Sequence, residues 1–95
     1  LSAVKYLFLI EVEYSESALK QLKKLDGQFQ RAIIQEMNEI ATLDDPRQRG
    51  KALKANLSGL WRYRVGDYRV ICDIQDAKIL ITVLRVGHRK NVYDT

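Results

Sequence analysis

The sequence predicts a small α+β protein in which a mostly antiparallel sheet carries helices on one side. Its 95 residues suffice for one domain with a single core, so we expect one domain over residues 1–95. Apolar side chains recur at helical spacing in the first half of the chain and follow a strand-like period in the second half. Short segments containing Gly and Asp separate the strand-like runs at hairpin spacing.

The first half is predicted to form one strand and two helices. Residues 4–14 are assigned to the strand, because charged and apolar side chains alternate at its end. Ser15 follows as a helix N-cap, and the apolar positions after it keep helical spacing as far as Leu25. Asp26-Gly27 interrupts this pattern, and a second apolar stripe extends over residues 28–43. Two helices joined by so short a break indicate a helical hairpin.

The second half is predicted to form three antiparallel strands, over residues 60–65, 68–74 and 78–86. The segments VGDY and QDAK between them have the length of hairpin loops. The segment LDDPRQRGK that precedes them ends the helical pattern, since Pro46 disfavours helix at the residue before it. The order of one strand, two helices and three strands is that of an α+β layer.

The chain carries a net charge of +4, and its two halves differ in sign. Residues 1–45 hold eight acids and five Lys or Arg, whereas residues 46–95 hold four acids and eleven Lys or Arg. No acidic residue occurs between Arg47 and Gly66. Such a separation of charge indicates a face that binds a polyanion. A solvated basic surface without a ligand is the alternative.

Four arginines are predicted to converge near this face. Side chains alternate in a strand, so Arg62 and Arg64 point away from the side taken by the aromatic residues between them. Arg69 starts the next strand and would lie across the hairpin, and Arg89 lies just past the last strand. A guanidinium holds a phosphate through two N–H bonds at once, which favours an anion site. The alternative is that these arginines pair with acids of the same half, namely Asp67, Asp73, Asp76 or Asp94.

Three further residues have open roles. Tyr93 either stacks on an unpaired base or packs the end of the sheet. His88 is either a general acid or base or a surface residue among cations. Cys72 alternates with apolar neighbours and is expected in the core. With one cysteine and one histidine the chain has no internal disulfide and no zinc-ligand set, so we expect a reducing compartment and no cofactor.

The C-terminal motifs resemble one known family. LWRYRVGDYRVICDI followed by ITVLRVGHRKNVY, together with ALKQLKKLD near the start, is similar to the RelE branch of the RelE/ParE toxin superfamily. The resemblance implies a RelE-like curved antiparallel sheet and a cytoplasmic toxin of a type II toxin–antitoxin system. It further implies a metal-independent endoribonuclease that enters the ribosomal A site, beside 16S rRNA, and cuts mRNA there by attack of the 2′-hydroxyl. A RelB-like antitoxin would block the toxin and carry its contact with operator DNA.

The resemblance also implies residue roles. Arg62 and Arg64 match a basic pair that is lysine in well-studied members, Arg69 matches a phosphate-binding arginine, and Arg89 matches the proposed general acid. Tyr93 matches a tyrosine that stacks on a base, and Gly87 would let the chain turn off the last strand to bring Arg89 and Tyr93 to the arginine face. The predicted RNA-binding residues are Lys51, Lys54, His88 and Lys90.

The arginine pair leaves the general base open. A lysine can lose its proton among cations, whereas an arginine effectively cannot, so either the activity is weak or His88 or Tyr93 takes the role of base. Two other functions fit the same pattern: a ParE-like inhibitor of DNA gyrase, and a non-catalytic module that binds RNA or the ribosome. An inactive remnant that only binds the antitoxin is a further alternative.

Overall fold

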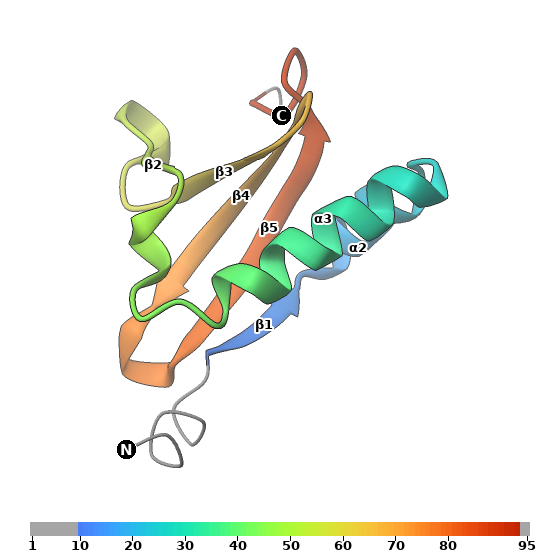
Figure 1. The fold of residues 1–95 in the computed structure, drawn as a ribbon. Coiled ribbons are helices and arrows are strands. Elements are labelled where there is room, and N and C mark those ends of the chain that lie inside the picture. The colour runs from blue at the N-terminus through green and yellow to red at the C-terminus, as the bar shows by residue number, and fades with distance from the viewer. Residues whose placement is uncertain (1–9, 94–95) are drawn as a thin grey trace.

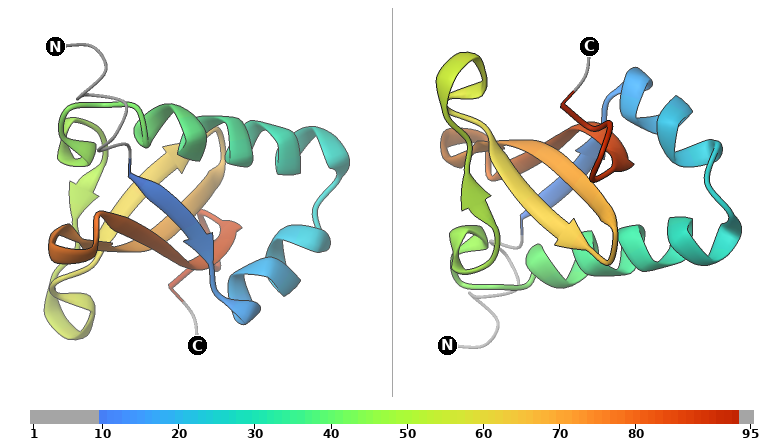
Figure 2. Two further views of the ribbon diagram at one scale, coloured as in Figure 1. Left: turned by 90° about the horizontal axis from the view of Figure 1, so that it is seen from below. Right: turned by 90° about the horizontal axis from the view of Figure 1, so that it is seen from above.

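The computed structural model describes residues 10–93, which form a strongly twisted five-stranded sheet covered on one face by two helices (Figure 1). The strand order is β1-β5-β4-β3-β2, and Figure 2 shows the two helices on the same side of the sheet. The elements are β1 (Glu11–Tyr14), α2 (Glu16–Lys23), α3 (Gly27–Ile40), β2 (Lys51–Ala52), β3 (Trp61–Val65), β4 (Tyr68–Gln75) and β5 (Leu80–His88). Single 3-10 turns lie at Pro46–Gln48, Ala55–Leu57 and Asp76–Lys78.

The predicted α+β fold is confirmed, with two differences in the sheet. β1 runs parallel to β5, with Glu11 opposite Leu80, so the sheet is mixed. The short strand β2 pairs with β3 and forms an edge that the sequence did not predict, because two residues are too few for any periodicity. Residues 4–9 of the predicted first strand lie outside the described residues.

The helical hairpin follows from local capping signals. The Ser15 hydroxyl accepts a hydrogen bond from the Ala18 N–H at 3.0 Å, as an N-cap does, and donates to the Leu84 carbonyl of β5 at 3.3 Å. Asp26 is the N-cap residue of α3, so the predicted break is confirmed. Within residues 10–93 neither helix is long and apolar enough to cross a membrane.

The core lies between the helices and the sheet, and a β-bulge shapes its boundary. The buried residues of this core are Ala18, Leu22, Ile33, Met37, Ile40, Tyr63, Val70, Cys72, Ile81, Val83 and Val86. Ile71 is opposite Arg85, but Cys72 is opposite Val83, so β5 has one extra residue between these pairs. The bulge turns Val83 toward the core and Arg85 toward the other face.

Tyr63 joins this core to the loop before β2. Its side chain is 1% exposed, and its hydroxyl donates a hydrogen bond to the Pro46 carbonyl at 2.8 Å. Burial raises the pKa of Tyr63, so the phenol keeps its proton. We expect Tyr63→Phe to lower the free energy of unfolding by about 1–3 kcal/mol, because the carbonyl is left unpaired. Urea denaturation measures this, with Tyr68→Phe as the control; equal losses in both variants would contradict it.

Candidate functional site

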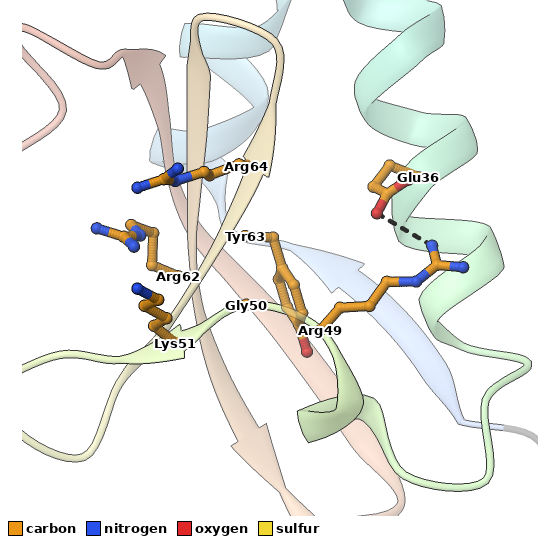
Figure 3. A pocket seen from close by; sticks show the side chains of 7 residues that line it. All are labelled: Glu36, Arg49, Gly50, Lys51, Arg62, Tyr63 and Arg64. Carbon is orange, nitrogen blue, oxygen red and sulfur yellow. Dashed lines mark hydrogen bonds and ion pairs between the residues drawn. The ribbon is translucent and has the colours of Figure 1, made fainter.

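The face of the sheet away from the helices carries a group of cations. Lys51 on β2 and Arg62 and Arg64 on β3 extend to one side of the sheet, and Tyr63 extends to the other (Figure 3). Arg64 and Arg69 are direct partners in the β3–β4 hairpin, so the predicted position of Arg69 across from the pair is confirmed. These side chains, with Arg85, are called the cationic face below: Lys51, Arg62, Arg64, Arg69 and Arg85.

Arg85 belongs to this face although sequence reasoning did not select it. Strict alternation along β5 places Arg85 on the same side as Ile81 and Val83, which are buried in the core. The bulge next to Arg85 reverses that assignment and brings it into one lateral row with Ile71 and Arg62. No simple sequence signal marks a bulge here, so only the strand register reveals the residue.

A pocket of about 200 Å³ lies at the edge formed by β2 and β3 (Figure 3). The Nε of Arg62 is buried and has no hydrogen-bond partner among the described residues. The side chains of Lys51, Arg62 and Arg64 point away from the Glu36 side of this pocket (Figure 3), so the pocket itself is not the anion site. The lining residues of the pocket are Glu36, Arg49, Gly50, Lys51, Arg62, Tyr63 and Arg64.

The hairpin turn between β3 and β4 holds two of the predicted site arginines. Nη1 of Arg69 donates to the carbonyls of Gly66 and Tyr68, each at 2.9 Å. The backbone N–H of Arg89 donates to the Asp67 carbonyl at 2.7 Å, and its Nε lies 3.7 Å from the Asp67 carboxylate. For Arg89 the structure therefore shows the alternative arrangement, in which its guanidinium is paired with Asp67.

The C-terminal segment folds back over the cationic face. Nη1 of Arg62 donates to the Tyr93 hydroxyl at 3.3 Å, so the structure brings Tyr93 to this face. Gly87 stays within β5 without a positive φ, and the prediction that it turns the chain is wrong. Its role is close packing, because a Cβ at Gly87 would lie 3.4 Å from Val92. The turn comes after it, where Asn91 and Val92 donate to the His88 carbonyl.

Two other cations of the acid-free stretch, Arg47 and Arg49, are paired with acids. Arg47 forms two hydrogen bonds with Asp76, at 2.9 and 2.8 Å, and these hold the pKa of Asp76 below its usual range. Arg49 bonds Glu36 and Glu39 on α3 at 3.1 and 3.3 Å. Within residues 10–93, no carboxylate forms an ion pair with a member of the cationic face. Asp94, also predicted as a partner, lies outside the described residues.

The comparisons with known proteins decide the family. Residues 12–93 match the family described as the ParE toxin of type II toxin-antitoxin system, parDE. This chain is a toxin of the RelE/ParE family. Toxin RelG of Mycobacterium tuberculosis is 32% identical over 85 residues, which cover 86% of the chain and 93% of RelG. Toxin RelE of the same organism is 29% identical over 82 residues, which cover 86% of this chain and 84% of RelE. The resemblance seen in the C-terminal motifs is thus confirmed.

Solved structures agree with this family. The toxin-antitoxin complex RelBE2 of M. tuberculosis matches with a TM-score of 0.72 and 30% identity over 86% of this toxin and 93% of that chain. The archaeal RelE-RelB complex of Pyrococcus horikoshii matches with a TM-score of 0.69, and the match covers 88% of this toxin and 99% of that chain. The intact RelBE complex of Escherichia coli matches with a TM-score of 0.67, and the match covers 83% of this toxin and 95% of that chain. The last two, at 24% and 17% identity, establish the fold alone.

Three predicted RNA-binding residues of the toxin stand apart from the cationic face. His88 lies on the helix side, where its ring contacts Tyr68 edge-on at 5.8 Å between ring centres. Its Nδ1 accepts a hydrogen bond from the Lys90 N–H at 3.2 Å. Lys54 and Lys90 are exposed, and no hydrogen bond or ion pair to a described residue ties either ammonium group to the face. Of the predicted RNA-binding residues, the structure brings only Lys51 there.

Proposed function

We propose that the toxin is a ribosome-dependent endoribonuclease that cuts mRNA in the A site. The observation that carries the proposal is the grouping of Arg62, Arg64 and Arg69 on one face, with the Tyr93 hydroxyl bonded to Arg62. Several guanidinium groups without carboxylate partners among residues 10–93 suit the phosphates of a single strand. Tyr93 is 40% exposed, so its ring is available to stack on a base.

In the proposed reaction the 2′-oxygen of the mRNA forms a bond to the adjacent phosphorus, and the bond from phosphorus to the 5′-oxygen breaks. Arg62, Arg64 and Arg69 stabilise the negative charge that develops on the phosphoryl oxygens. Once it has moved away from Asp67, the Arg89 guanidinium stabilises the negative charge on the leaving 5′-oxygen, which takes its proton from water. His88 lies on the other side of the sheet, so Tyr93 is the candidate base: its hydroxyl takes the 2′-proton and passes its own proton to water.

Primer extension on a defined mRNA translated in vitro tests this function. We expect new 5′ ends that appear only with ribosomes and fall in codon register, with little cleavage of free RNA, because an open face positions a flexible strand poorly. Lys78→Ala is the matched control, since it removes one exposed cation at the opposite end of β4. Arrested synthesis with intact mRNA would leave a non-catalytic ribosome-binding toxin in place of the nuclease.

Inhibition of DNA gyrase is the second candidate, because the matching family is described by its ParE member. A supercoiling assay with purified gyrase separates the two functions. Inhibited supercoiling together with unimpeded translation would favour the gyrase inhibitor. The cationic face and Tyr93 support the ribosomal target.

The cognate partner is proposed to be a RelB-like antitoxin, as in the solved RelBE complexes, and it would carry any contact with operator DNA. A cytoplasmic location follows from a ribosomal target. An antitoxin segment that covers the cationic face should be acidic, so we expect its affinity to fall as salt rises. Calorimetry at low and high ionic strength measures this, and a salt-independent affinity would contradict it.

Asp67 is expected to weaken RNA binding by this toxin. Its carboxylate is the partner of Arg89, 3.7 Å away, so it competes with a phosphate. Asp67→Asn keeps the backbone bond to Arg89 and should raise the affinity for single-stranded RNA by about fivefold at low salt, as one charge is worth ~1 kcal/mol at this range in water. Fluorescence anisotropy measures it. Asp26→Asn, before α3, is the control, and an equal gain there would show only a net-charge effect.

A further inference from the structure

One buried apolar side chain, that of Ile71, lies on the face of the sheet away from the helices, apart from the main core. Ile71 on β4 has no exposed surface, although it faces away from the helices. Its lateral neighbours are Arg62 on β3 and Arg85 on β5. Apolar stems of arginine side chains cover such a residue while their guanidinium groups reach outward. Val92, 5% exposed, is another buried apolar residue outside that core.

The two arginines hold consecutive residues of the C-terminal segment. Arg62 donates to the Tyr93 hydroxyl at 3.3 Å, and Nη1 of Arg85 donates to the Val92 carbonyl at 3.5 Å. Since the strand order is β5-β4-β3, the segment from Val92 to the tip of Tyr93 extends from the β5 side to β3 across β4. The packing of Val92 on Gly87 brings its backbone close to the sheet.

We infer that Arg85 is a positioning residue for Tyr93. The inference rests on the proposed function and adds a residue that the family resemblance does not assign. The carbonyl that Arg85 binds belongs to the peptide unit directly before Tyr93, so the bond limits where the tyrosine ring and hydroxyl can lie. A ring held in place loses less conformational freedom when a base stacks on it, and correct placement of reacting groups is worth large factors in rate.

The Arg85→Met variant tests this inference, because methionine keeps an apolar stem over Ile71 and removes the donor. In the free toxin we expect the amides of Asn91 and Val92, which bond the His88 carbonyl, to exchange with solvent at least several-fold faster. In the ribosomal assay we expect kcat to fall about tenfold, within the ~10²-fold range for misplaced groups, with little change in KM. Arg85→Lys, which keeps a donor, should restore most of the amide protection and most of kcat. Should Arg85→Met fail to fold, Arg85→Leu, which also lacks a donor, replaces it.

A double variant decides whether Arg85 acts through Tyr93. Arg85→Met added to Tyr93→Ala should cost no further rate, because the residue to be positioned is gone. Additive losses, or a rise in KM alone, would mean that Arg85 binds RNA directly and would overturn the inference. Unchanged amide exchange in Arg85→Met would also overturn it. Absence of cleavage by the wild-type toxin would instead overturn the proposed function. The Lys78→Met variant is the control for the loss of one positive charge.

Discussion

Replacing Arg69 with alanine is expected to lower the rate of ribosome-dependent cleavage by about 10²–10³-fold, the usual cost of removing one preorganised donor from a charged transition state. The turn carbonyls of Gly66 and Tyr68 both bind Nη1 of Arg69, so its guanidinium is held in place before any substrate arrives. Arg69 also lies directly opposite Arg64, and the two guanidinium groups can act on one phosphate. Single-turnover cleavage of mRNA on purified ribosomes measures the loss.

Arg89→Ala should reduce the same rate by about 10²–10³-fold, because the charge on the leaving oxygen loses one stabilising donor. Both arginines are exposed enough that neither alanine variant should unfold the toxin, which circular dichroism checks. Lys78→Ala should keep full activity and toxicity. Unchanged growth arrest in both arginine variants would contradict the proposed site.

Gly50→Ala is expected to have the largest effect on stability. Gly50 has a φ of +79°, and a Cβ there would lie 2.3 Å from the Arg62 carbonyl oxygen and 2.7 Å from Nε1 of Trp61. The Trp61 indole is held close to Gly50, because its Nε1 donates a hydrogen bond to the Arg49 carbonyl at 2.7 Å. Strain of this kind costs about 1–3 kcal/mol before any clash is counted.

We therefore expect Gly50→Ala to lower the melting temperature by about 10 °C or more, since 1 kcal/mol shifts a domain of this size by about 4–8 °C. Thermal unfolding followed by circular dichroism measures the change. Gly27→Ala is the matched control, because Gly27 starts α3 without a positive φ and a Cβ there meets only the Arg31 side chain. Equal melting temperatures for the two variants would contradict the prediction, since they would show that β2 can move away from β3 without loss of stability.

The elements of the fold and part of the site follow from local patterns in the chain. Ser15 and the Asp26-Gly27 break mark the two helices, because capping and turn preferences act within a few residues. Alternation in β3 separates Arg62 and Arg64 from Tyr63, since successive side chains of a strand point to opposite faces. The two-residue loop of VGDY then places Arg69 opposite Arg64.

The rest of the site depends on contacts between distant parts of the chain. The pairing of Arg89 with Asp67 and the bond from Arg62 to Tyr93 join residues more than 20 positions apart, and no spacing rule predicts them. The bulge opposite Ile71 reverses the side on which Arg85 lies.

By itself the sequence determined the order of helices and strands, the sign of the charge on the second half and the face of the arginine pair, because these depend on propensity and on the period of two. Only the tertiary structure decided the parallel pairing of β1 with β5, the side taken by His88 and Arg85, and the return of Tyr93 to the arginines. Register shifts and long-range packing set those positions, and they depend on the whole sheet at once.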